Sequence, residues 1–307
     1  MGELRQDVVI YGDTSILEAG AKLLNLDIAF NPLSEDQQPV EGQLNVVDLN
    51  LLKASDLTPG ILNTRAGAAA RSYVERATLD ALNKKVAGVV TLPMNKEATR
   101  ASDPDFIGHT EFIAGLCNTP DISMMLTTND IAVSHLSTHV ALKDAIKLVS
   151  VERITMIINL THAALSAFIE SPRIAVCGVN PHAGEHGLFG EEDEKIVRPA
   201  IEAAVRRGLN VTGPHPADTV FYQAIHNDRH DAIVCMYHDQ GHAPMKLISF
   251  ESGVNVTIGL PIIRTSVDHG TAFDIAWQGK AFTSSLEHAL GYAWKLAGKQ
   301  AKQTTFQ

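Results

Sequence analysis

The sequence predicts an α/β fold with a mainly parallel sheet, and three observations support this prediction. Short apolar runs of strand length alternate with longer segments of helical period along most of the chain. Polar loops that contain His, Asn, Gly and Asp follow several of the apolar runs. The chain has 307 residues, which is enough for one or two domains with a large buried core.

The strand-like and helix-like segments follow one another in a regular order. A strand over residues 8–11 precedes a helix that Asp13 and Thr14 are expected to cap. A second strand covers 45–49, and a long helix over 63–85 places its small apolar residues on one side. Later strands are expected at 86–92, 122–127, 131–136, 173–179, 231–236 and 254–258, and later helices at 111–116, 151–169, 191–207 and 284–299.

Turn residues separate these segments. The runs 122–127 and 131–136 are predicted to form a hairpin around Asn129 and Asp130. The helix that ends at Arg207 stops at Gly208, as many helices do at a glycine. The polar stretch 32–42 reads as a surface loop rather than as a domain boundary.

The composition is that of an ordinary globular protein and disfavours several other classes of protein. The chain is 45% hydrophobic and 20% charged, and its net charge of −10 disfavours a nucleic-acid binder. No apolar run approaches the roughly 20 residues of a membrane helix, and the first residues do not resemble a signal peptide. The three Cys are far apart and are expected to be free thiols, so a cytoplasmic protein is predicted.

Three histidine-containing motifs follow strand-like segments. They are 137–139 with His139, 180–185 with His182, and 236–246 with His238. Imidazole nitrogen is a good ligand for borderline-soft divalent metals, and three such ligands leave open positions for a substrate. A metal held there would act as a Lewis acid and lower the pKa of a bound hydroxyl. The alternative is that each histidine only makes hydrogen bonds in its loop, since the chain has 13 His.

Two groups of residues are candidates for binding an anion. His109 and Thr110 open a helix-like segment, where backbone N–H groups favour a negative charge, although Thr110 could be only an N-cap. Lys246, Asn255 and Arg264 recur at equal spacing and combine a point charge, an amide donor and a guanidinium fork. Any of the three could be a solvated surface residue, but the apolar surroundings of Arg264 disfavour an idle charge.

The chain lacks the GxGxxG fingerprint of a Rossmann dinucleotide site. A glycine-containing loop over 268–276, predicted to lead into a helix, is similar to the loop that holds adenosine in isopropylmalate and isocitrate dehydrogenases. The alternative for its first residue is a simple turn. The predicted cofactor-binding residues are Asp268, His269, Gly270, Thr271 and Asp274.

Along nearly its whole length the chain resembles the 4-hydroxythreonine-4-phosphate dehydrogenase (PdxA) family. The matching motifs are Leu92–Lys96, Gly108–Glu111, Ser137–His139, Gly178–Glu185, Pro216–Thr219, Tyr237–Gly241, Gly259–Pro261 and Arg264–Thr271. The resemblance implies an isopropylmalate-dehydrogenase-like homodimer whose chains each have two α/β/α domains and an interdomain cleft. The expected cofactor-side domain is 1–100 with 260–307, and the expected metal, substrate and dimer domain is 101–259.

The resemblance also implies roles for individual residues. One divalent ion per site, Zn, Mg, Mn or Co, would be bound by ligands from both subunits. The implied metal ligands are His139, His182 and His238; the substrate-binding residues are His109, Thr110, Lys246, Asn255 and Arg264; the catalytic residues are Lys246, Asp218 and Asp239.

The implied activity is an oxidation of a 4-phosphorylated 3-hydroxy acid that uses NAD or NADP and is followed by loss of CO₂. Residues 241–247 and 273–277 look more like the branch that acts on 4-phospho-D-threonate or 4-phospho-D-erythronate than like the vitamin B6 enzyme, which acts on 4-phosphooxy-L-threonine. One alternative is a cis-dihydrodiol dehydrogenase of the same family. Another is a non-catalytic, metabolite-binding homodimer, because the family's N-terminal Gly-rich segment has no counterpart at the start of this sequence.

Overall fold

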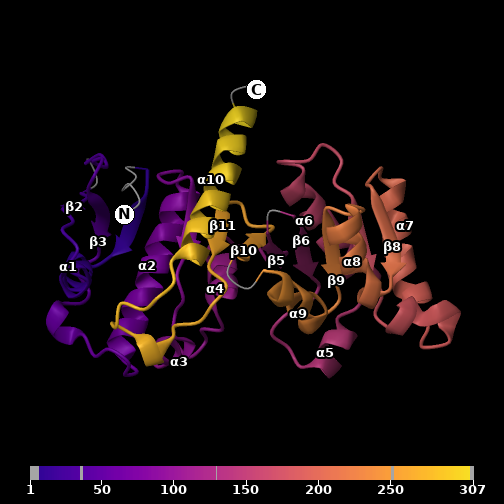
Figure 1. Ribbon diagram of the computed structural model, residues 1–307, viewed down its shortest axis with the longest axis horizontal. Coiled ribbons are helices and arrows are strands. Elements are labelled where there is room, and N and C mark those ends of the chain that lie inside the picture. Colours follow the sequence, from indigo (N-terminus) through magenta and orange to yellow (C-terminus); the bar gives the residue numbers. More distant parts are fainter. Residues whose placement is uncertain (1–6, 35–36, 129, 250–251, 305–307) are drawn as a thin grey trace. The chain divides into compact units, whose positions relative to one another are not determined.

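The structure, a computed structural model, describes residues 7–34, 37–128, 130–249 and 252–304 (Figure 1). These residues divide into two compact units. Unit 1 takes its residues from Met1–Val86, Thr91–Asn118 and His269–Thr283, and unit 2 takes its residues from Ala87–Val90, Thr119–Asp268 and Ser284–Gln307. The unit boundaries differ from the expected domain boundaries, because 101–118 lie in unit 1 whereas 87–90, 260–268 and 284–307 lie in unit 2.

Unit 1 contains a small parallel sheet in the order β1-β3-β2. Its strands are β1 (Val9–Gly12), β2 (Phe30–Pro32) and β3 (Leu44–Asp48). Its helices are α1 (Thr14–Leu23), α2 (Thr64–Leu82), α3 (Lys96–Arg100) and α4 (His109–Leu116), with 3-10 turns at Ala54–Asp56 and Phe273–Ile275. The loop over 268–276 thus contains only the short turn Phe273–Ile275 and does not lead directly into a helix, since the next helix begins at Ser284.

Asp13 occupies the N-cap position of α1, but the predicted side-chain cap is wrong. Its buried carboxylate instead accepts hydrogen bonds from the backbone N–H groups of Leu51 at 2.9 Å and Leu52 at 2.7 Å. The hydroxyl of Tyr73 donates a third bond at 2.5 Å. Asp13 thus connects the end of β1 to the loop after β3 and to α2. These three hydrogen bonds stabilise the buried carboxylate more than a single cap bond would.

Unit 2 is built on an eight-stranded mixed sheet in the order β4-β11-β10-β5-β6-β9-β7-β8. Its strands are β4 (Gly88–Thr91), β5 (Ser123–Thr127), β6 (Ala132–His135), β7 (Ile174–Cys177), β8 (Val211–His215), β9 (Ala232–Cys235), β10 (Val254–Ile258) and β11 (Ile263–Ser266). Strands β6, β9, β7 and β8 are parallel, whereas β10 is antiparallel to β5 and β11, and β5 is antiparallel to β6. The predicted mainly parallel sheet is confirmed for β6, β9, β7 and β8, while the pairs β5–β6, β5–β10 and β10–β11 are antiparallel.

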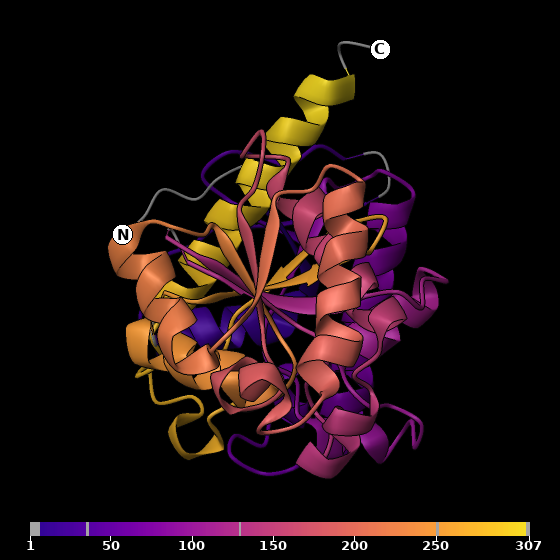
Figure 2. The ribbon, with the colours of Figure 1, turned by 90° about the vertical axis from the view of Figure 1, so that its right-hand side faces the viewer.

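Helices cover both faces of this sheet, which Figure 2 shows from the β8 end. The helices are α5 (Leu142–Lys147), α6 (Val151–Leu165), α7 (Arg198–Arg206), α8 (Ala217–Asn227), α9 (His238–Ile248) and α10 (Ser284–Thr304). A π-helical turn at Asp193–Val197 leads into α7, so the helix expected at 191–207 has a change of pitch at its start. The predicted α/β class is confirmed. The predicted hairpin β5–β6 is also confirmed, although Asn129 lies outside the described residues.

The alternation of side chains along β9 divides the core of unit 2 into two layers. Ala232, Val234 and Met236 pack with α6, α7 and α10, whereas Ile233 and Cys235 pack with α8 and α9. All five side chains are 0% exposed, as expected for a parallel strand that helices cover on both faces. Among the described residues, no helix combines the length and the apolar character that crossing a bilayer requires.

We expect Gly67→Ala to destabilise unit 1 by about 1–3 kcal/mol, because its new methyl group would overpack the contact between α2 and α3. A Cβ at Gly67 would lie 2.4 Å from the carbonyl of Ala98 and 2.6 Å from the nitrogen of Thr99. The free energy of unfolding, measured by urea denaturation, tests this expectation. Gly115→Ala in α4 is the matched control, since its Cβ would meet nothing within 4 Å and helix propensity predicts a gain of about 0.5–1 kcal/mol. Equal stabilities for the two variants would refute the close-contact argument.

Candidate functional site

The three predicted metal ligands of unit 2 follow three neighbouring parallel strands. His139 comes after β6, His238 after β9 and His182 after β7, and the sheet order places β9 between the other two. The registers Ser134↔Val234 and Val176↔Val234 align the three strands. Because the carboxyl ends of parallel strands meet at one edge of a sheet, the three loops begin at the same edge, where ligands bind in open α/β sheets.

Helix α9 presents His238, His242 and Lys246 at intervals of four residues, and therefore on one face. The rings of His238 and His242 are stacked, with centroids 3.7 Å apart and planes 9° apart. Gly241 allows this helix to lie against β6, because a Cβ at that position would be 2.4 Å from Nε2 of His135. The ring of His139 lies 5.8 Å from that of His238, so four imidazoles gather at the start of α9.

His135 and His242 form a buried imidazole pair. Nδ1 of His135 lies 3.4 Å from the carbonyl oxygen of Met124, which can only accept, so Nδ1 carries the proton. Nε2 of His135 then accepts from Nδ1 of His242 at 3.0 Å. Burial, followed by the charge of His242, lowers the pKa of His135 to about 3. Burial, followed by the charge of His238, lowers the pKa of His242 to about 4, so both rings are neutral near pH 7.

Carboxylates fix the tautomers of two predicted metal ligands. Nδ1 of His238 donates to Asp239 at 2.8 Å, and Nδ1 of His182 donates to Glu185 at 3.0 Å. The hydrogen bond to Glu185, followed by that residue's charge, raises the pKa of His182. Each neutral ring is left with a lone pair on Nε2, which is the arrangement that metal-ligating histidines have when a carboxylate holds the other nitrogen. The donor chemistry of these residues therefore fits a divalent metal.

Within one chain, the three predicted metal ligands do not come together. Among the residues that the structure describes, no group of three His, Cys, Asp or Glu side chains is close enough to hold one ion. His139 and His238 are brought together, whereas His182 has Glu185 and the ring of Phe189 as its neighbours. Asp218, in the first turn of α8, adds a charge that also raises the pKa of His182.

The loop that carries His182 has an unusual backbone. Six consecutive residues, His182 to Gly187, have positive φ, and four of these residues are not glycine. Such left-handed conformations cost free energy for residues with a side chain and persist only where their surroundings enforce them. Asp193 supplies part of that enforcement: it is 0% exposed and accepts bonds from the backbone N–H groups of Val179 at 2.7 Å and Asn180 at 3.1 Å.

The anion-binding candidates of unit 2 lie on the sheet face that α9 covers. Val254, Val256 and Ile258 pack on the opposite side with α6, so Asn255 and Thr257 point toward the α9 side. Nη1 of Arg264 donates to Oγ1 of Thr257 at 2.9 Å, which places Arg264 on the same face. Lys246 of α9 forms an ion pair with Asp268, just beyond β11, and donates to its carbonyl oxygen at 2.9 Å.

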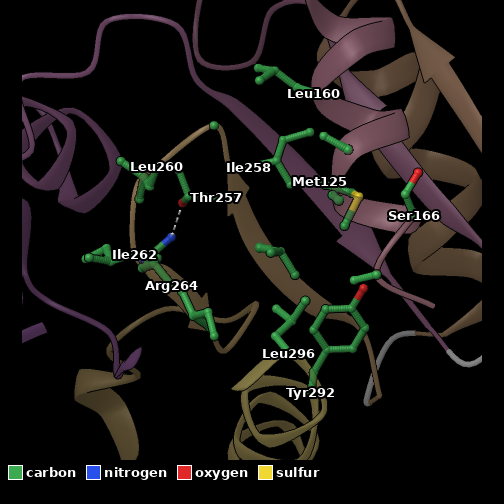
Figure 3. A pocket seen from close by; sticks show the side chains of 16 residues that line it. Met125, Leu160, Ser166, Thr257, Ile258, Leu260, Ile262, Arg264, Tyr292 and Leu296 are labelled. Atoms are coloured by element: carbon green, nitrogen blue, oxygen red, sulfur yellow. Dashed lines mark hydrogen bonds between the residues drawn. The ribbon is translucent and has the colours of Figure 1, made fainter. Parts of the chain in front are cut away.

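A pocket of about 360 Å³ opens beside the β10–β11 hairpin (Figure 3). Its walls come from α6, α10 and the hairpin, with Leu160, Tyr292 and Leu260 among the side chains. Figure 3 shows the guanidinium of Arg264 directed toward Thr257 at one end. The described residues that line the pocket include no histidine, so this pocket is distinct from the cluster at the start of α9.

The remaining predicted site residues belong to unit 1. His109 and Thr110 begin α4, whose N-cap is Gly108, so the alternative that Thr110 is itself the N-cap is wrong. Of the predicted cofactor residues, Asp268 ends a segment of unit 2, and the others lie in the loop of unit 1 that contains the turn Phe273–Ile275.

His135, His242, Gln240 and Asp193 were not among the predicted site residues. The spacing of His238 and His242 was the available signal for His242, because two residues four apart share a helix face. His135 ends an apolar strand, and Asp193 lies in an acidic run, so neither position stands out in the sequence.

A family model and a sequence relative both match nearly the whole chain. The model of the family described as "Pyridoxal phosphate biosynthetic protein PdxA" matches residues 3–293. The D-threonate 4-phosphate dehydrogenase of Cupriavidus necator is 45% identical over 298 residues, which cover 95% of this chain and 89% of that protein.

Two solved structures extend the comparison. A 4-hydroxythreonine-4-phosphate dehydrogenase from Klebsiella pneumoniae superposes with a TM-score of 0.86 at 42% identity, over 94% of this chain and 88% of that chain. A terephthalate 1,2-cis-dihydrodiol dehydrogenase from Burkholderia xenovorans superposes with a TM-score of 0.65 at 28% identity, over 93% of this chain and 96% of that chain.

The buried His135 predicts an acid-sensitive unit 2. Its pKa of about 3 lies below the ordinary value of 6.5, so the unfolded chain binds the proton more readily. Stability is therefore full above about pH 6.5 and falls as the pH drops toward 3, by up to about 1.4 kcal/mol per pH unit. Urea denaturation between pH 7 and pH 4.5 measures this slope.

The variant His135→Gln removes this titration and is expected to reduce the pH dependence of unfolding, while His242, whose pKa is also lowered, still contributes. His226→Gln, at an exposed position in α8, is the matched control and should keep the wild-type slope. A slope in His135→Gln that equals the wild-type slope would contradict the assignment.

Proposed function

Since the chain belongs to the PdxA family, whose model matches residues 3–293, we propose that it is a dehydrogenase that oxidises a 4-phosphorylated 3-hydroxy acid. The name of the Cupriavidus necator relative, at 45% identity, makes D-threonate 4-phosphate the first substrate to test. The observation that carries the proposal is the edge of the unit 2 sheet, where His139, His182 and His238 follow three neighbouring strands.

The proposed reaction balances with NAD or NADP as the oxidant. The C3–H bond of the substrate would break, NAD or NADP, when bound, would accept its hydrogen and electron pair as hydride, and the hydroxyl proton would pass to a basic group. The resulting 3-keto acid then loses CO₂, and the enolate that remains takes up a proton. The proposed cofactor residues Asp268, His269, Gly270, Thr271 and Asp274 would hold the adenosine part.

We assign His139, His182 and His238 to a divalent ion, Zn, Mg, Mn or Co. When bound, such an ion supplies a positive charge that lowers the pKa of the substrate hydroxyl and stabilises negative charge on its oxygen. The carboxylates of Asp239 and Glu185 support this assignment, because they leave Nε2 of His238 and His182 available. Since the described part of one chain does not gather three such ligands, we propose that a second copy completes the site in a homodimer.

The phosphate of the substrate is assigned to Lys246, Asn255 and Arg264, with His109 and Thr110 as further donors. Binding energy from this group would orient the reacting carbon, although the phosphate takes no part in the oxidation. Asp268 already pairs with Lys246, so an incoming phosphate must compete with that carboxylate. Lys246, Asp218 and Asp239 remain the proposed catalytic residues, and Asp239 acts by holding the ring of His238.

A second candidate function is a cis-dihydrodiol dehydrogenase. The similarity to the Burkholderia xenovorans structure, with a TM-score of 0.65 at 28% identity, favours it. Such a substrate has no phosphate, so Lys246 and Arg264 would have no anionic group to hold.

We expect the purified protein to reduce NAD⁺ or NADP⁺ with D-threonate 4-phosphate when a divalent metal is present. Absorbance at the nicotinamide band measures the rate, and the same acid without its phosphate is the matched control, which should react far more slowly because remote binding energy is lost. Turnover of a cis-dihydrodiol alone would favour the second candidate. No turnover of either class with saturating metal would refute the dehydrogenase proposal.

Replacing His182 by Ala is expected to abolish metal-dependent turnover without unfolding the chain, because this side chain is exposed and its ring is proposed to bind the ion. Circular dichroism checks the fold, and initial rates with a metal titration check the activity. His226→Ala in α8 serves as the control and should retain the wild-type rate. A wild-type rate in the His182 variant would remove this residue from the proposed ligand set.

A further inference from the structure

Two buried side chains connect the backbone at the starts of the three histidine loops. Oγ of Ser137 donates to the carbonyl oxygen of Met236 at 3.0 Å. Oε1 of Gln240 accepts from the N–H of Met236 at 2.7 Å, while Nε2 of Gln240 donates to the carbonyl oxygen of Gly178 at 2.8 Å. Ser137 is 7% exposed, Gln240 is 8% exposed and Met236 is 0% exposed, so water cannot readily replace these bonds.

Each of these residues is close in sequence to one of the proposed ligands. Ser137 precedes His139 by two positions, and Gln240 follows His238 by two positions. Gly178 begins the loop that carries His182. The bonds at Met236 therefore connect the loop after β6, the turn between β9 and α9, and the loop after β7.

The side chain of Gln240 continues the pairing of β9 with β7 beyond the strands. The last paired residues in the register are Val176 and Val234. Two residues further on, the backbone groups of Gly178 and Met236 are joined through the amide of Gln240. One amide with an acceptor at one atom and a donor at the other satisfies two buried backbone groups, which an apolar or a charged side chain could not do.

We propose that Ser137 and Gln240 are positioning residues that set the spacing of His139, His182 and His238. This inference rests on the proposed function, because it assumes that the three rings serve one divalent ion. Ser137 and Gln240 act through the backbone and touch neither the ion nor the substrate.

Asp193 would still hold the start of the His182 loop if Gln240 were replaced. The carboxylate of Asp193 holds the N–H groups of Val179 and Asn180 and also accepts from Nδ2 of Asn180 at 3.0 Å. A variant without the Gln240 amide therefore keeps one anchor of the loop and loses the connection to Met236. The expected defect is a displaced His182 in a chain that still folds.

The test compares Gln240→Met and Ser137→Ala with wild type by titration of Co²⁺, followed through its visible absorption. Loss of a residue that orients metal ligands typically weakens metal binding by about 10–100-fold, and we expect that range for Gln240→Met. Hydrogen exchange at the amides of 178–186 should also become faster, and this measurement needs no metal.

Matched controls remove the same kinds of bond in unit 1. Gln37→Met loses an exposed amide that accepts from the N–H of Ser34 at 3.0 Å, and Ser15→Ala loses a half-buried hydroxyl that donates to Leu52 at 3.1 Å. Both controls should bind Co²⁺ within about twofold of wild type.

The outcomes separate the two proposals. Should wild type bind no Co²⁺, the proposed metal site fails, and the exchange rates alone decide whether Gln240 holds the His182 loop. Wild-type affinity together with wild-type exchange in Gln240→Met would overturn the positioning role. If that variant does not fold, Gln240→Glu, which keeps the acceptor for Met236 and loses the donor to Gly178, replaces it with the same expected result and the same overturning result.

Discussion

The placement of the three histidine loops depends on the parallel pairing of β9 with β6 on one side and with β7 on the other. The central strand is fully buried, with alternate side chains in two separate core layers, so a one-residue shift of its register would exchange those layers. That register fixes where the three histidine loops start. The sheet therefore determines where the imidazoles gather, and the conformations of the loops determine how the rings are oriented.

Much of the fold could be predicted from the sequence, for identifiable reasons. Strands β7, β9 and β10 are continuous apolar runs, and α2 and α6 show helical periodicity. Helix α9 was missed because Gly241 and Pro244 lie within it and its first turn is polar. Its helical form comes from tertiary contacts, with Met245 buried under the sheet and Gly241 against β6, which a local pattern does not express.

The site was predictable only in part. The motifs singled out His139, His182 and His238 as candidates, and the sheet order explains why their loops share an edge. The contact between His135 and His242 could not be predicted this way, because the two residues are separated by 107 positions and meet only after folding. The left-handed turn at 182–186 was likewise invisible, since positive φ at four residues with side chains contradicts their intrinsic preference and depends on Asp193.

The close approach of α9 to β6 has a consequence for how this chain can change over evolutionary time. The absence of a side chain at Gly241 and the large ring of His135 are complementary in volume, with 2.4 Å available where a methyl group would sit. A bulkier residue at 241 demands a smaller one at 135, and that exchange deletes the acceptor that orients His242. The two positions are thus expected to covary, because a substitution at 241 is tolerated only after a smaller residue has replaced His135.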